Sequence, residues 1–401
     1  MTQKPTLKRK LTLPLLILYG LGNILGAGIY VLVGKVAGEA GYGAVLAFLV
    51  AMVVAALTAF SYMEFAARYP VSAGVSVYAH KAFRQRWLSL GLGIVTVMSG
   101  VASAAALSQG FAGYLNTIVS IPTGIASVGL LVVLGLIAIR GIGESAWFAA
   151  GLTLLEIAGL ALVIWAGKDA LATADYGRLF SIDPTVGLAG LAAGAFLAFY
   201  AFIGFEDMVN VVEEVKRPRR NMPLAILVSL LVATALYLLV AVVALGVVGP
   251  AELAASNAPL ALVYERAGFA NPVVLTTIGM IAAINGVIVQ IIMGSRILYG
   301  LSRQGWIHER FSDVHTTMQT PVKATLLVVG VMIIGTLLLP LVSLAQFTSL
   351  LVLTIFAVVN TGLVVVKLRQ AMPRPDVNVP LVIPIAGSLS SILLIVWQFT
   401  L

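Results

Sequence analysis

The chain has 401 residues, of which 60% are hydrophobic and only 10% are charged, whereas soluble domains carry about 25% charged residues. Its 16 acidic and 24 basic side chains, with a formal net charge of +8, are too few to cover a water-soluble surface of this size, so the composition excludes a soluble globular protein and indicates one that lies in lipid. The absence of cysteine and the presence of only three histidines exclude disulfides and thiolate chemistry, and we expect no metal site and no cofactor.

Runs of about 20 apolar residues predict eleven transmembrane helices, and therefore an all-α integral membrane protein. In chain order the runs are 11–33, 42–63, two within 88–139, 145–167, 187–212, 223–248, 270–301, two within 324–366, and 377–401. The polar stretches between the runs are short, so we expect residues 1–401 to form a single transmembrane domain.

The basic residues are distributed unevenly between the two sides of this predicted bundle. With the N-terminus placed in the cytoplasm, only four of the 24 bases lie outside, namely Lys35, Lys168, Arg178 and Arg266. This is the asymmetry of the positive-inside rule, so the net charge reflects topology and indicates no nucleic-acid partner. A cleaved signal peptide is the alternative for the first run, but the run is long and lacks a small-residue cleavage site.

Two of the predicted helices are interrupted by glycine. Helix 1 is broken at Gly26-Ala-Gly28 and helix 6 at Ile203-Gly204-Phe205-Glu206. Each opens a block of five helices, about 11–167 and about 187–367, followed by an extra helix at about 377–401. Because each block has an odd number of spans, the two repeats are expected to be inverted, and such paired broken helices are typical of secondary transporters with a midplane site. Close packing through Gly22 and Gly26 is the alternative, but it does not explain the second break.

Acidic residues within the spans are the strongest chemical signal. A carboxylate at the centre of a membrane helix costs about 2.5–3.5 kcal/mol to insert, so such a residue is a functional candidate by default. Glu156 lies midway along helix 5, and Glu206 directly follows the break in helix 6, with Asp207 on a different face. Loss of hydration favours the protonated carboxyl, as a proton carrier requires. The alternative for Glu156 and Glu206 is a neutral carboxyl that only ties helices together. Glu64, four residues before Arg68, is expected to be structural.

Four segments of the chain match a known pattern in the same order. They are Gly22-Asn-Ile-Leu-Gly-Ala-Gly-Ile-Tyr30, Tyr62-Met-Glu-Phe-Ala-Ala-Arg-Tyr-Pro70 with Ser72-x-Gly74-x-x-x-Tyr78, Phe199-Tyr-Ala-Phe-Ile-Gly-Phe-Glu206 with Glu213-Glu-Val-Lys-x-Pro218, and Ser295-Arg-x-Leu-Tyr299 with Thr320-Pro-Val-Lys-Ala324. Over helices 1 to 10, and less strictly helix 11, the chain resembles the amino acid–polyamine–organocation superfamily. The resemblance implies a LeuT-type fold of two inverted repeats that works by alternating access.

The resemblance also implies a substrate site at the two breaks. Backbone N–H groups of helix 1 would bind the substrate carboxylate, and carbonyl groups at both breaks would bind its ammonium group. Phe202 would close the site from outside, and Glu206 would sense protons. The substrate-binding residues implied are Ile24, Gly26, Ala27, Gly28, Ile29, Tyr200, Ala201, Phe202, Ile203, Gly204, Glu206 and Gln290, and those implied in ion coupling are Glu156 and Glu206.

Two positions depart from the family pattern. Related amino acid carriers often have a lysine at the position of Glu156, where its ammonium group replaces sodium, so coupling by a titrating lysine does not carry over. The arginine/agmatine exchanger has a tryptophan at the position of Gln290, so strict arginine specificity does not carry over either. Asn285 and Gln290 also lie within helix 8, where interhelical hydrogen bonding is the simplest expectation.

The function expected is a secondary active amino acid permease of the cell membrane, a symporter or antiporter that is linked to protons or to sodium. Its partners would be an amino acid or amine, the coupling ion and membrane lipid. A polyamine or organic-cation carrier is one alternative, and a transporter-like nutrient sensor is another, although a sensor usually carries a long signalling tail. An enzyme is not expected, because no nucleophile–base or metal-binding constellation lies in the spans.

Overall fold

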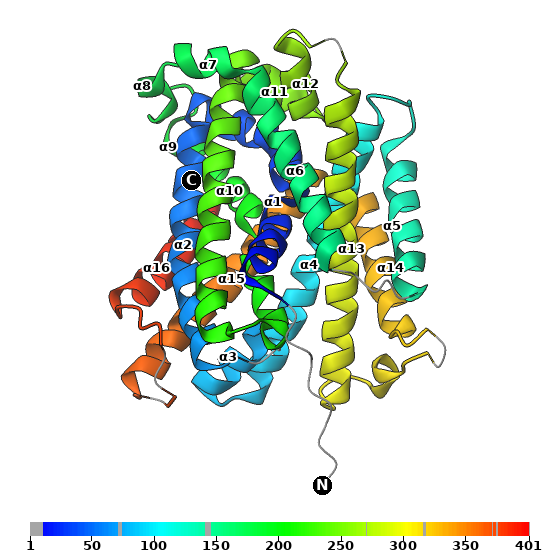
Figure 1. The fold of residues 1–401 in the computed structure, drawn as a ribbon, viewed down its shortest axis with the longest axis vertical. Coiled ribbons are helices and arrows are strands. Elements are labelled where there is room, and N and C mark those ends of the chain that lie inside the picture. The colour runs from blue at the N-terminus through cyan, green and yellow to red at the C-terminus, as the bar shows by residue number, and fades with distance from the viewer. Residues whose placement is uncertain are drawn as a thin grey trace.

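The computed structural model describes residues 11–70, 74–140, 146–269, 271–315, 318–370, 372–373 and 376–400. Throughout this part of the chain the regular structure is helical, and the long helices form one bundle (Figure 1). The predicted all-α membrane class is confirmed. The predicted helix ends at residues 145, 270 and 401 lie outside the described residues.

Each predicted span has a helix at its place. The long helices are α1 (Leu13–Ala40), α2 (Ala44–Arg68), α4 (Arg86–Leu115), α5 (Thr123–Arg140), α6 (Ala146–Ala166), α9 (Gly187–Phe199), α10 (Pro218–Val247), α13 (Val273–Arg303), α14 (Val322–Leu338), α15 (Leu341–Leu368) and α16 (Val382–Thr400). Nine helical runs in the described residues are long and apolar enough to cross a membrane; one run contains both α1 and α2, and the 17-residue α14 is apolar but shorter. Counting α1 and α2 separately turns the nine runs into ten spans, and α14 is the eleventh.

The short helices gather at the two ends of the bundle. The helix α3 (Gly74–Phe83) and the 3-10 turn η4 (Glu309–Ser312) lie at one end. At the other end lie α7 (Lys168–Thr173), α8 (Tyr176–Leu179), α11 (Pro250–Ala255) and α12 (Pro259–Arg266), close to the 3-10 turn η1 (Gly41–Gly43) (Figure 1). The loops that the positive-inside rule assigns to one side of the membrane therefore share one end of the molecule.

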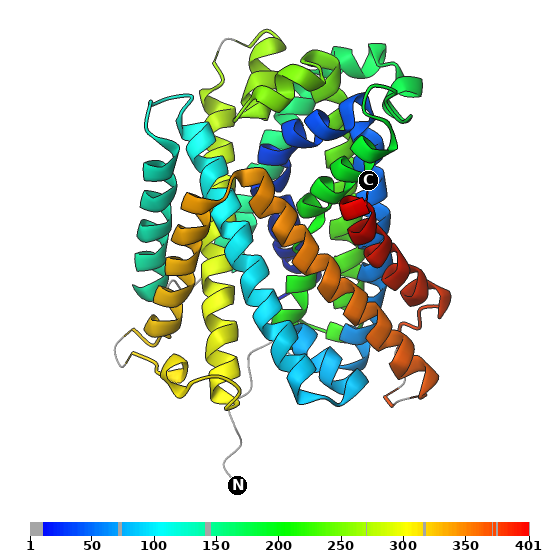
Figure 2. The same ribbon diagram turned by 180° about the vertical axis from the view of Figure 1, so that it is seen from behind.

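The outer surface of the bundle is apolar. Large side chains are exposed on α5, α14 and α16, among them Leu136, Leu338 and Leu393. Trp147 and Trp165 are exposed at opposite ends of α6, as expected for indole rings at the two membrane–water interfaces. From behind, α15 runs diagonally beside α4, with α16 along its outer edge (Figure 2). Lipid, rather than water, is the solvent that such a surface requires.

Both predicted helix breaks are present. In α1 the helical geometry is lost at Gly26, where φ is 14° and ψ is −155°. At the second break, α9 is followed by the 3-10 turn η2 (Tyr200–Phe202), and the chain is extended at Ile203. The chain then continues as the 3-10 helix η3 (Phe205–Glu214). Gly204 has φ of 127°, a conformation that favours glycine because it has no Cβ atom. The inverted relation of the two five-helix repeats stays a prediction.

Glu64 holds three segments together at the α3 end of the bundle. Its side chain is fully buried, and one carboxylate oxygen accepts hydrogen bonds from Arg68, with Nη2 at 2.7 Å. The other oxygen lies 2.8 Å from Nζ of Lys367 on α15 and 2.8 Å from the backbone nitrogen of Val379, just before α16. We call these four residues the Glu64 cluster. They give Glu64 the structural role that the sequence predicts.

Candidate substrate site

The two broken segments touch each other through their backbones. A Cβ atom built on Gly204 would lie 2.4 Å from the carbonyl oxygen of Asn23 and 3.0 Å from the nitrogen of Ile24. A Cβ atom on Gly28 would lie 3.1 Å from Cα of Ala201. Neither neighbour is a flexible side chain, so a Cβ atom is excluded at Gly204 and would press the backbones apart slightly at Gly28.

A tyrosine that the sequence did not indicate bridges the two breaks. Tyr237 of α10 is fully buried, and its hydroxyl lies 2.7 Å from the carbonyl oxygen of Ile24 and 2.9 Å from that of Ala201. The family resemblance assigned both carbonyls to a substrate ammonium group. In this structure both accept the Tyr237 hydroxyl, whose ring packs edge-on against Phe202 with 5.2 Å between centroids.

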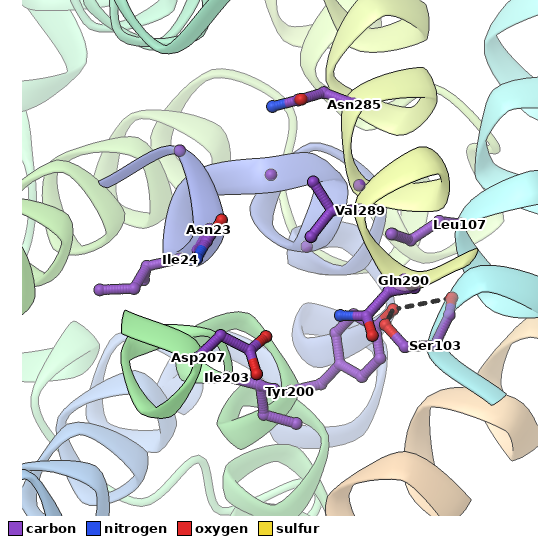
Figure 3. A pocket seen from close by; sticks show the side chains of 14 residues that line it. Asn23, Ile24, Ser103, Leu107, Tyr200, Ile203, Asp207, Asn285, Val289 and Gln290 are labelled. Carbon is purple, nitrogen blue, oxygen red and sulfur yellow. Dashed lines mark hydrogen bonds between the residues drawn. The ribbon is translucent and has the colours of Figure 1, made fainter. Parts of the chain in front are cut away.

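A small pocket of about 40 Å³ lies where the breaks meet. It is bounded by α1, α4, the break after α9 and α13 (Figure 3). Its lining residues are Gly22, Asn23, Ile24, Gly26, Gly28, Ser103, Leu107, Tyr200, Ile203, Asp207, Asn285, Gly286, Val289 and Gln290. On one wall the hydroxyl groups of Tyr200 and Ser103 lie 2.8 Å apart. We call this space the inner pocket.

A wider cavity of about 750 Å³ adjoins the inner pocket. The two share Ser103, Ile203, Asp207 and Gln290 as lining residues. The wider cavity extends to His80 on α3 and to the residues that follow α13, at the end of the bundle where α3 lies (Figure 1). We call it the vestibule. The vestibule thus lies between the inner pocket and the end of the molecule that the charge distribution assigns to the cytoplasm.

Two adjacent acids occupy different places along this path. A carboxylate oxygen of Glu206 accepts the N–H of Gly204 at 2.8 Å, and the side chain lines the vestibule. Asp207 lines both the vestibule and the inner pocket, and Figure 3 shows its carboxylate directed into the open space below Asn23. The sequence placed the two acids on different faces and proposed Glu206 for the substrate site; both line the vestibule, and Asp207 alone of the two also lines the inner pocket. A pair of neighbouring acids does not reveal which one points inward.

Comparison with known proteins identifies the family. A family profile described as "Amino acid permease" matches residues 11–401. The chain belongs to this family. An uncharacterized transporter of Mycobacterium tuberculosis is 31% identical over 97% of this chain and 86% of the relative. The permease is also 28% identical to the human cationic amino acid transporter 4, over 93% of the chain and 62% of that protein. It is 28% identical to a branched-chain amino acid permease of Bacillus subtilis, over 92% of the chain and 83% of that protein. It is a multi-pass membrane transporter and not an enzyme.

The permease brings about half of the predicted substrate-binding residues to these cavities. Those lining the inner pocket are Ile24, Gly26, Gly28, Tyr200, Ile203 and Gln290. Glu206 lines the vestibule. Ile29, Ala201, Phe202 and Gly204 are buried but line neither cavity. Phe202 packs instead between Phe48 and Tyr237. The side chain of Ala27 lies outside the described residues.

Glu156 lies behind the inner pocket of the permease. Its side chain is fully buried, and Oε1 accepts a hydrogen bond of 3.1 Å from the amide of Asn285. Among the described residues, Oε2 of Glu156 has no hydrogen-bond partner. Because Asn285 also lines the inner pocket, a single amide group separates the pocket from the buried acid. The interhelical hydrogen bond expected for Asn285 is confirmed.

Proposed function

We propose that this permease moves amino acids across the cell membrane by alternating access, as a secondary active transporter. The observation that carries the proposal is the meeting of two broken helices at a small pocket that adjoins a vestibule towards one end. Irregular backbone at membrane depth is tolerated where it is buried in protein or lines a cavity, and paired broken helices surround the substrate in many secondary transporters.

The inner pocket offers complementary groups to an amino acid. Beyond Gly26, α1 starts a new helical turn. The first N–H groups of a helical turn have no carbonyl partner within the helix, so they favour an anion such as a carboxylate. The carbonyl groups of the break after α9 offer acceptors to an ammonium group. A pocket of about 40 Å³ holds only a few water molecules, so a bound amino acid would also fill the adjoining part of the vestibule.

Counterflow in proteoliposomes tests this function. Vesicles containing the purified permease and preloaded with an unlabelled amino acid should accumulate the same labelled compound, while vesicles preloaded with the decarboxylated amine should not. Equal counterflow with the amine would favour a polyamine or organic-cation carrier, since the helix N–H groups would then have no carboxylate to bind. Specific binding without counterflow for any compound would favour a transporter-like sensor.

The proposed orientation places the N-terminus and the α3 end in the cytoplasm, because 24 − 4 = 20 of the bases then lie inside. Single cysteines can be introduced at His315 and at Asp175 in this cysteine-free chain. In intact cells an impermeant thiol reagent should label the cysteine at position 175 and should leave position 315 unlabelled until the membrane is opened. The reverse pattern would place the vestibule outside.

Coupling to protons through Glu156 is the second part of the proposal. Within the described part of the chain, the buried carboxylate has one oxygen without a partner, and it is linked to the inner pocket through Asn285. The Glu156→Gln substitution keeps the shape and removes the titrating group. We expect net uptake driven by a pH gradient to fall at least about tenfold, while exchange of substrate across equal pH persists.

The matched control is Glu309→Gln, which changes an exposed acid on η4 and should leave gradient-driven uptake as in the wild type. If Glu156→Gln instead abolishes a dependence on sodium, the acid binds a cation rather than a proton. Wild-type pH and ion dependence in the variant would make Glu156 a structural residue and Glu206 the next candidate.

A further inference from the structure

Asp207 is the only carboxylate among the described residues that line the inner pocket, and no lysine, arginine or histidine lines it. None of the ion pairs or hydrogen bonds found among the described residues involves its side chain. The carboxylate of the neighbouring acid, Glu206, already accepts a hydrogen bond from the backbone N–H of Gly204. In the described part of the chain, Asp207 therefore presents a carboxyl group without a protein partner where the inner pocket adjoins the vestibule. A cationic partner would stabilise its ionised form by offsetting the loss of hydration.

Apart from Asp207 itself, the described residues that line the inner pocket are neutral. Gln290 approaches Gly100 of α4 so closely that a Cβ atom on that glycine would lie 2.6 Å from Oε1 of the glutamine. The amide nitrogen of Gln290 accordingly faces the cavity (Figure 3). The hydroxyl groups of Tyr200 and Ser103 form a hydrogen bond with each other. Among the described residues, the basic side chains of the vestibule, His80, Lys81 and Arg296, do not line the inner pocket, so a cationic group of the cargo fits beside Asp207 there.

We propose that Asp207 binds the positively charged side chain of a cationic amino acid, such as lysine or ornithine, and so determines substrate specificity. The inference rests on the proposed amino acid transport. The α-carboxylate and α-ammonium groups would lie at the two breaks, and the side chain would extend towards the vestibule past Asp207, which lines both cavities. The charged end of the substrate would then lie at the mouth of the inner pocket.

The test compares lysine with leucine on the purified permease. Binding of each labelled amino acid is measured by scintillation proximity for the wild type and for Asp207→Asn, which preserves the shape of the side chain. A hydrogen bond between charged groups is lost for lysine only, so lysine affinity should fall about tenfold or more and leucine affinity should change less than about twofold. Asp207→Glu should recover part of the lysine affinity.

Glu214→Gln is the control, because it removes an acid that lines the vestibule but not the inner pocket. It should leave the ratio of lysine to leucine affinity unchanged; an equal loss in this variant would point to general electrostatic attraction and overturn the inference. Equal losses of both amino acids in Asp207→Asn would assign the carboxylate to the α-ammonium group instead. Wild-type binding of leucine without lysine overturns this inference alone, whereas binding and transport of no amino acid would overturn the proposed function.

Discussion

Replacing Gly26 with leucine should abolish substrate binding, with a loss of affinity of at least about a hundredfold. A Cβ atom at this position would meet nothing within 4 Å, and Gly26 lines the inner pocket. The side chain would therefore extend into a space of about 40 Å³, where a leucine side chain takes the place of the ligand. Scintillation proximity binding, together with size-exclusion chromatography for folding, measures the two consequences separately.

Gly129 provides a matched control, because it is an exposed helical glycine on α5 that also has nothing within 4 Å of a built Cβ atom. Gly129→Leu should bind substrate normally. Gly26→Ala should give an intermediate loss, since one methyl group fills less of the pocket. Wild-type affinity in Gly26→Leu would remove the substrate from the break in α1.

Gly28 should behave differently from Gly26, although the sequence gives both the same role. Its built Cβ atom lies 3.1 Å from Cα of Ala201, and backbone atoms cannot move aside as a flexible side chain can. A bulky residue here would separate the two breaks as well as disturb the pocket. At Gly26 a larger side chain meets no neighbouring atom directly, and the folding measurement separates loss of binding from any effect on the unusual backbone angles there.

Replacing Glu64 with alanine should lower the free energy of unfolding by about 3–5 kcal/mol, because it removes the carboxylate from a buried ion pair and leaves its cations behind. In the Glu64 cluster, Arg68 is 7% exposed and Lys367 is 11% exposed, so water can hydrate neither group well. The backbone N–H of Val379 would also lose its acceptor. Thermal unfolding of the detergent-solubilised permease, followed by size-exclusion chromatography, should show a clear drop in midpoint.

The exposed pair Asp313–Lys323 serves as the comparison, with side chains that are 58% and 57% exposed. Asp313→Ala should cost less than about 1 kcal/mol, because solvent screens such pairs. Similar small shifts in both variants would show that the Glu64 cluster adds little stability.

The sequence was sufficient for the features that depend on local pattern. Hydropathy located the long helices, because each apolar run must be about as long as the membrane is thick. Glycine located both breaks. The short helices α7, α8, α11 and α12 were not predicted, since segments of four to eight residues are too short for a hydrophobic period to be recognised.

The sequence was insufficient where function depends on contacts between distant segments. Nothing local marks Tyr237 as the residue that bridges two carbonyls from α1 and from the break after α9. The choice between Glu206 and Asp207 depends on the 3-10 geometry of η3, which turns successive side chains by a different angle from an α-helix. Phe202 was expected at the cavity, but its packing on Phe48 and Tyr237 needed the positions of α2 and α10.

The backbone contact between the two breaks has a consequence for the direction of transport. The two broken helices, one from each half of the chain, meet without an intervening side chain. Gly204 lies against the backbone of Asn23, and Gly28 lies against that of Ala201. Under the proposed alternating access, if these contacts persist while access changes sides, both walls of the candidate site move as one piece and keep their shape. The affinity would then be similar from either face, and the concentration and ion gradients alone would decide whether the solute enters or leaves the cell.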